Sequence, residues 1–150
     1  YNNHYQIVQS PGYVMIMAEM VHDARIIRLG GSHPADNITP WLGDSIGHWE
    51  GNTLVVETTN FNSQHTFRGG LRHFFAITPE AIVTERFTRL SKDQILYQFY
   101  VDDSDIYKQV WAGEMPLRSV ADKIYEYACH EGNYSMANIL AGAREEEKRR

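Results

Sequence analysis

Alternating hydrophobic and polar positions dominate the first 130 residues and predict short β-strands separated by turns. The segments 4–10, 13–21 and 24–31 all carry this pattern. Turn formers separate them, namely Pro11-Gly12 and the sequence "HDA". We therefore expect these three segments to form an antiparallel meander.

The stretch "SIGHWEGNTLVVETTNF" predicts a hairpin with a defined register. Its Gly51-Asn52 pair suits a two-residue turn, because glycine accepts the positive φ that a type II′ turn requires at its first central position. Trp49 then lies opposite Leu54. One face of the hairpin, which we expect to point inward, carries Trp49, Leu54, Val56, Thr58 and Asn60.

Two further hairpins are predicted over 81–103 and 107–130, the second ending in the strand "KIYEYACH". Two long connections interrupt the pattern. Segment 32–42 contains two prolines and indicates a loop that crosses an end of the sheet. Segment 62–80 has no clean period and contains Gly69-Gly70, which favours a long loop or lid.

Roughly nine strands in this order predict a mainly β fold, in which an antiparallel meander closes into a lipocalin-like β-barrel without exposed edges. A chain of 150 residues suits one domain. We expect a single barrel domain over 1–150, with the barrel reaching to about residue 131 and a C-terminal α-helix and charged tail over 133–150.

The C-terminal segment "YSMANILAGAREEEKRR" predicts that helix. Met136, Ile139, Leu140 and Ala143 recur at the spacing of one helical stripe. A stripe of this kind is buried in a folded protein, so the helix lies either on the barrel or in a subunit contact of a homo-oligomer.

Composition and charge exclude several classes of protein. Hydrophobic residues make up 43% and charged residues 22%, as in ordinary globular domains. The net charge of −5 leaves no cationic face for nucleic acid. No apolar run approaches a membrane span, and no leader segment is expected at the start of this chain. The lone Cys129 excludes an internal disulfide.

The chain lacks the motifs of several common enzyme classes: G-x-S-x-G, a glycine-rich phosphate loop, H-E-x-x-H and a calcium loop. We therefore expect neither a metal nor an organic cofactor. The alternative is a metal site assembled from dispersed ligands. It would use His22, His48 and His130 with Glu19 or Glu131.

The sequence "EMVHDAR" contains the first candidate general base. Glu19 interrupts the alternation over 13–17, which otherwise marks an apolar face. An acid on a buried face needs a partner or a raised pKa, and either condition favours a site. Arg25 would orient a substrate or a second carboxylate with its planar donors. The alternative for the remaining polar residues of this turn is a solvated hairpin tip.

Glu85 is the second candidate base. Glu85 and Arg86 are neighbours on a predicted strand, so they point to opposite faces. Glu85 shares its face with Val83 and Phe87 and is therefore the inward residue. The alternative is an ion pair between Glu85 and an arginine of another strand.

The sequence "YEYACHEGNY" groups further polar residues before the helix. On a strand, Tyr127 and Cys129 share one face and His130 points to the other, so Cys129 and His130 do not form a thiol-imidazole couple. His130 or Tyr127 would be the proton donor, with Glu131 at the rim of the cavity. The alternatives are a buried inert thiol and a histidine that bonds backbone groups at the helix start.

These candidates predict a cavity that binds a small, largely apolar or aromatic molecule and transforms it by acid-base chemistry of a lyase, isomerase or hydrolase type. The rival hypothesis is a non-catalytic binding or transport protein with the same barrel, whose acids are merely paired with arginines. The expected substrate-binding residues are Arg25, Arg86, Tyr97, Trp111, Trp49, Asn60 and Glu131.

Two longer stretches, "WLGDSIGHWEGNTLVVETTNFN" and "IYEYACHEGNYSMANILAGA", carry a resemblance. Nearly the whole chain resembles a group of largely uncharacterised bacterial proteins with W-x-G-D-S-x-G-x-W-E-G-x-T-L-V-V and Y-E-Y-A-C-H-E-G-N-Y stretches. Those proteins are typically longer and carry a secretion signal. The resemblance implies a secreted or periplasmic protein and implies no particular reaction.

Overall fold

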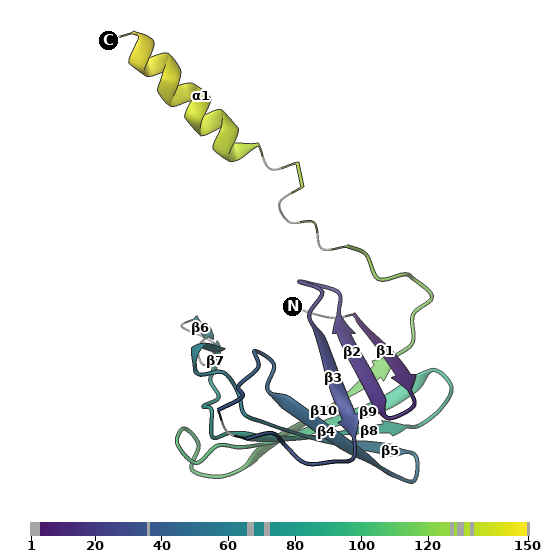
Figure 1. The fold of residues 1–150 in the computed structure, drawn as a ribbon. Helices are drawn as coiled ribbons and strands as arrows, with labels where there is room; N and C mark the ends of the chain where they lie inside the picture. The colour runs from purple at the N-terminus through teal and green to yellow at the C-terminus, as the bar shows by residue number, and fades with distance from the viewer. Residues whose placement is uncertain are drawn as a thin grey trace.

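The computed structural model describes residues 4–35, 37–65, 68–70, 73–126, 128, 131–132 and 134–149. In this part of the chain, eight strands form one mixed sheet in the order β1-β2-β3-β4-β5-β8-β9-β10, and β6 and β7 form a separate small hairpin (Figure 1). The strands are β1 (Tyr5–Ser10), β2 (Tyr13–Ala18), β3 (Ala24–Leu29), β4 (Asp44–Glu50), β5 (Thr53–Thr59), β6 (Arg68–Gly70), β7 (His73–Phe75), β8 (Ile82–Arg89), β9 (Gln94–Asp102) and β10 (Trp111–Arg118). The helical elements are the 3-10 turn η1 (Ser63–His65) and the helix α1 (Ser135–Lys148).

The sheet is a curled half-barrel. Strands β1 to β3 rise at a steep angle from the layer that β4, β5, β8, β9 and β10 form (Figure 1). Within the described ranges, β1 and β10 are the two edges and are not paired with each other. The mainly β class and the C-terminal helix are confirmed, whereas closure into a lipocalin-like barrel stays a prediction.

The predicted antiparallel meander is wrong at one point, because β3 and β4 are parallel. Their pairing runs from Ile27 opposite Ser45 to Leu29 opposite Gly47. A tight turn can join only antiparallel strands, whereas a parallel neighbour needs a long crossover. The connection 30–43 is long enough to carry the chain back to the end of the sheet at which β3 begins.

The hairpin registers follow the turn residues. Gly12 has φ +80° in the turn between β1 and β2. Gly51 has φ +61° in the turn between β4 and β5, and Trp49 lies opposite Leu54 as predicted. Leu54, Val56 and Thr58 are buried, which confirms the expected inward face at these positions.

Two segments differ from the expectation. Segment 62–80 holds η1 and the hairpin of β6 and β7 rather than a featureless loop. The final strand expected over 123–130 is absent where the structure describes this segment, at 123–126 and 128. These residues instead belong to an irregular arm that leaves the sheet after β10 (Figure 1).

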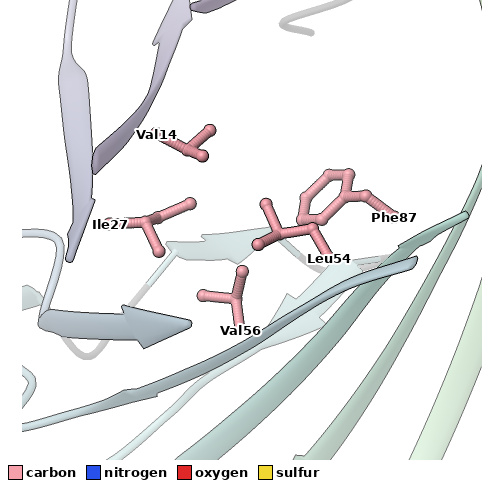
Figure 2. Close-up of a cluster of buried hydrophobic side chains, with 5 residues drawn as sticks. All are labelled: Val14, Ile27, Leu54, Val56 and Phe87. Atoms are coloured by element: carbon pink, nitrogen blue, oxygen red, sulfur yellow. The ribbon is translucent and has the colours of Figure 1, made fainter. Parts of the chain in front are cut away.

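The hydrophobic core joins the two parts of the half-barrel. In Figure 2, side chains from β2 and β3 meet side chains from β5 and β8. Burying an aliphatic or aromatic side chain of this kind contributes about 1.5–3 kcal/mol. The cluster consists of Val14, Ile27, Leu54, Val56 and Phe87.

Helix α1 stands apart from the sheet at the end of the arm (Figure 1). None of its 14 residues is buried. No helix among the described residues is both long and apolar enough to cross a membrane.

Candidate functional site

A buried ion pair crosses the concave face of the half-barrel. The Arg25 guanidinium donates to both carboxylate oxygens of Glu85, from Nη1 to Oε2 at 2.5 Å and from Nη2 to Oε1 at 3.0 Å. The Tyr97 hydroxyl donates to Glu85 Oε1 at 2.8 Å. Glu85 is only 5% exposed. The inward orientation of Glu85 is thus confirmed, and the partner is the arginine that the alternative interpretation required.

Electrostatics in this group favour a structural role. Burial opposes the charge of Arg25, but the Glu85 carboxylate outweighs it and raises the pKa of Arg25. Burial, and then the neighbouring Glu85 carboxylate, raises the pKa of Tyr97. The Glu85 carboxylate already accepts three hydrogen bonds and offsets the charge of Arg25, so taking up a substrate proton would leave that charge without its partner.

Glu19 does not lie on a buried strand face, so that expectation is wrong. Strand β2 ends at Ala18, and Glu19 lies in the following turn. Its carboxylate bonds His4 Nδ1 through Oε2 at 2.8 Å and the Tyr125 backbone N–H through Oε1 at 3.3 Å. The bond from His4, followed by that from Tyr125, lowers the pKa of Glu19 from its ordinary value of 4.5.

Glu19 and His4 lie in a cleft of about 990 Å³ between the two open edges of the sheet. This volume is at the upper end of the range for small-molecule sites, roughly 300–1,000 Å³. Apolar side chains from three places line it: Tyr5 and Ile7 of β1, Ile95 and Leu117 of β9 and β10, and Ile124 of the arm. Charged side chains at the cleft, besides the pair, are Asp93, Arg118, Asp122 and Lys123.

The turn beside this cleft has an unusual backbone. Val21 and His22 have φ of 72° and 58°. Positive φ in a β-branched residue such as Val21 is a genuine outlier, and such strain clusters at functional sites. His22 lines the cleft. The strained turn therefore brings a second imidazole to the same side of the molecule as His4.

Arg86 lies on the outer face of the sheet, away from the cleft. It donates from Nη2 to Glu50 Oε2 at 2.8 Å, and His48 Nε2 lies 3.2 Å from Glu50 Oε1. These bonds, the one from Arg86 first, lower the pKa of Glu50. The group is partly exposed, and ion pairs of this kind contribute little to stability.

The predicted aromatic lining forms a row along the concave face. Tyr97 stacks on Phe87 with ring centroids 4.8 Å apart, and Phe99 lies 5.7 Å from Tyr97. Trp111 meets Phe99 edge to face at 5.4 Å. Tyr97 and Trp111 are thus connected through packed rings, and neither lines the cleft at the open edges.

The other expected binding residues lie elsewhere. Asn60 has φ +56°, and its Nδ2 bonds the carbonyls of the crossover loop, including Ile38 O at 3.3 Å. Trp49 lies opposite Leu54 but is 45% exposed near the end of β4, so the burial expected for it is not found. Glu131 is exposed in a turn of the arm. Tyr127 and His130 lie outside the described residues, so their expected roles stay predictions.

His4 is the residue that sequence reasoning missed, although a signal for it was present. A hairpin about Pro11-Gly12 pairs Ser10 with Tyr13 and, further along, Tyr5 with Ala18. Continued by one step, this register places His4 opposite Glu19, whose N–H bonds the His4 carbonyl at 3.0 Å.

A second polar cluster was also missed. His33 Nδ1 lies 2.7 Å from Asp44 Oδ2, and His33 Nε2 lies 3.3 Å from Glu57 Oε1. Arg28 Nη2 donates to Asp44 Oδ2 at 2.7 Å. The cluster ties the crossover loop to β3, β4 and β5. The loop that carries His33 follows β3 through two glycines, so its direction could not be inferred from alternation.

Among the residues that the structure describes, no group of three or more histidine, cysteine, aspartate or glutamate side chains is placed to hold a metal ion. Of the ligands considered for such a site, His22 lies at the cleft and His48 on the outer face.

A scan against protein-family models and searches of curated proteins and of solved structures find no match to this chain.

The Glu19 interaction makes a direct prediction about its titration. Because the folded-state pKa of Glu19 is depressed, its contribution to stability is present above pH 4.5 and is lost as the pH falls through the folded-state pKa. We expect carbon-13 NMR of the Glu19 carboxyl to give a pKa below 4.5, and His4→Ala to move it back toward 4.5. An unchanged Glu19 pKa in His4→Ala would exclude the interaction in solution.

Proposed function

We propose that the cleft between β1 and β10 binds a small, largely apolar or aromatic molecule, and that His4 performs acid-base chemistry on it without an organic cofactor. The observation that carries this proposal is the pairing of His4 with Glu19 at the cleft. A histidine oriented by a carboxylate is a recurring arrangement of general acid-base catalysts.

Each member of the pair has a role in this proposal. The depressed pKa of Glu19 keeps its carboxylate ionised at neutral pH. Because an ionised carboxylate only accepts hydrogen bonds, the proton of their bond is on His4 Nδ1. With the proton on Nδ1, His4 Nε2 would be the atom that accepts a substrate proton, and Glu19 would stabilise the imidazolium that forms. The apolar walls of the cleft would hold the substrate.

A non-catalytic binding or transport protein is the second candidate. It is favoured by the Arg25, Glu85 and Tyr97 group, in which a buried acid is satisfied by its own protein partners. In this function the cleft is a ligand site, and the His4–Glu19 pair only closes the β1–β2 hairpin.

Two broader features belong to the same proposal. A ligand held between the β1 and β10 edges would bridge them and complete the lipocalin-like barrel that the strand pattern predicts. An exported location, secreted or periplasmic, is supported by the resemblance to exported bacterial proteins.

Hydrolysis of p-nitrophenyl acetate tests for the proposed base. Water would attack the ester carbonyl while His4 Nε2 takes the water proton, and p-nitrophenolate leaves with acetate as the second product. We expect saturable release of p-nitrophenolate at pH 7.5. His4→Ala should lower kcat/KM by about 100-fold or more, which is the usual contribution of a positioned base. Glu19→Gln should lower it by a smaller factor, because the ring stays but loses its orientation.

The chain offers a matched control for this assay. His48 also pairs with a glutamate, but on the outer face, so His48→Ala should leave kcat/KM unchanged. Equal activity in His4→Ala and His48→Ala would contradict the catalytic role. Binding of the fluorescent probe 1-anilinonaphthalene-8-sulfonate would then be measured with Leu117→Asp in the cleft wall. Weaker binding in this variant would favour the non-catalytic binding or transport function over the catalytic one.

A further inference from the structure

Helix α1 carries an apolar stripe that no described part of the chain covers. Met136, Ile139 and Leu140 lie on the same side of the helix and are between 48% and 68% exposed. Asn138 and Glu145 lie on the opposite side. Helices with this pattern are stabilised in proteins mainly by packing their apolar side against another surface.

The outer face of the half-barrel also carries an uncovered apolar surface, on β1, β2 and β3. In the sheet register Val8 is opposite Met15, and Met15 is opposite Ile26, so three apolar side chains form a row across three strands. Tyr13 extends this row along β2. Val8, Tyr13 and Ile26 are between 42% and 51% exposed. We call these four residues, Val8, Tyr13, Met15 and Ile26, the outer patch.

The outer face beyond β3 is mainly polar, although Ile82 of β8 and Tyr100 of β9 are exposed apolar residues there. Outward positions of β4, β5 and β8 carry mainly charged and hydroxyl side chains, among them His48, Glu50, Glu57 and Arg86. A sheet with one solvated face shows such polar residues along its whole width. The change to apolar residues at β1 to β3 therefore marks this part of the face as a contact surface.

The area exposed by the chain supports the same conclusion. The chain exposes 11281 Å². A compact monomer of 17.3 kDa exposes roughly 7,800 Å² by the usual scaling of surface with mass. The surplus of roughly 3,500 Å² is several times the area of about 800 Å² that one partner contributes to a standard interface.

The two surfaces fit each other in size and chemistry. The stripe from Met136 to Ala143 extends about 10 Å along the helix axis. The outer patch spans three strands, which is about 10 Å from β1 to β3. All of its side chains are uncharged, as are those of the stripe. A single helix laid on the patch would cover both.

We propose that α1 of one copy of this chain packs on the outer patch of a second copy, and that the second copy returns the same contact. Helix α1 lies apart from the sheet of its own chain, so both surfaces are exposed together (Figure 1). Each chain thus presents one stripe and one outer patch. In a dimer with a twofold axis, each helix covers the patch of the other chain, so both stripes and both patches are buried and no further copy can add. None of the four patch residues lines the cleft, so this dimer is independent of the proposed function.

Sedimentation velocity over protein concentrations from 1 to 200 µM tests the dimer. We expect the unmodified chain to sediment as a dimer, and Ile139→Glu and Ile26→Glu each to raise the dimer dissociation constant at least tenfold. The matched controls introduce the same charge nearby: Asn138→Glu on the other side of α1, and Ala112→Glu at an exposed outward position of β10. Far-ultraviolet circular dichroism of each variant checks that the sheet is retained.

A crosslinking experiment identifies the two surfaces directly. In a Cys129→Ser background, one protein carries Ile139→Cys and a second carries Ile26→Cys. Mixed and oxidised, the two proteins should form a disulfide-linked heterodimer, because the helix of one reaches the patch of the other. A third protein that carries both cysteines tests for contact within one chain. The proposal is overturned by a monomer at all concentrations, by a dimer that both glutamate variants leave intact, or by a disulfide that forms within this third protein while the mixed pair gives no heterodimer.

Discussion

Arg25→Met should lower the free energy of unfolding by about 3–5 kcal/mol, the usual cost of leaving one charge of a buried ion pair without its partner. Glu85 would keep a bond from Tyr97 but lose both guanidinium bonds in a site that is 5% exposed. The change is measurable by urea unfolding followed by tryptophan fluorescence. A whole domain has a free energy of unfolding of only about 5–15 kcal/mol, so a loss of this size would leave the fold marginally stable.

Two control variants separate burial from charge. Arg86 follows Glu85 in the sequence but forms an exposed ion pair with Glu50. Arg86→Met should therefore lower the free energy of unfolding by only about 0–1 kcal/mol. The triple variant Arg25→Met, Glu85→Leu, Tyr97→Phe replaces the whole group by apolar side chains and should regain most of the loss, because no polar atom is left unsatisfied. Equal losses in Arg25→Met and Arg86→Met would show that the Arg25 pair is open to water.

Gly43→Ala should destabilise the protein by about 2–5 kcal/mol. Gly43 has φ +69°, where an alanine costs about 1–2 kcal/mol. An added Cβ would also lie 2.7 Å from the Thr59 carbonyl oxygen and 2.8 Å from Thr58 Cγ2, and overpacking of this kind costs about 1–3 kcal/mol. Thermal unfolding by circular dichroism should show the melting temperature falling by about 5–15 °C.

Gly51→Ala is the matched control for this substitution. Gly51 has φ +61°, so the backbone cost is similar, but no atom lies within 4 Å of an added Cβ. The melting temperature should therefore fall by only about 2–8 °C. If both variants lost the same stability, the close approach of Gly43 to β5 would not contribute to the loss. The end of the crossover loop would then be able to move away from β5 to make room for the added Cβ.

Local patterns predicted the strands and the direction of their side chains. The hairpin of β4 and β5 was predicted with its register because Gly51-Asn52 fixes it. The inward position of Glu85 followed from its apolar neighbours on the same face. In both cases the information lies within a few residues along one strand or turn.

Contacts between distant strands were not predictable in the same way. Arg25 and Glu85 belong to β3 and β8, which are separated by β4 and β5 in the sheet. Three strand spacings amount to about 14 Å along a flat sheet, so the bond exists only because the sheet curls. The His4–Glu19 pair was missed for a different reason, since the predicted strand was extended through Glu19 instead of ending at Ala18.

The short parallel pairing of β3 and β4 gives the sheet a seam. Backbone pairing there runs only from Ile27 to Leu29, while the chain on either side forms longer antiparallel ladders. Each side is continuous in sequence, so each can form its ladders through local contacts, which favours rapid assembly of the separate parts. We therefore expect the last folding step to be the docking of β1 to β3 on the remaining strands through the shared core. Partial unfolding should separate the sheet at the same place. In amide hydrogen exchange, β1 to β3 should open as one cooperative unit before the amides of the remaining strands lose their protection.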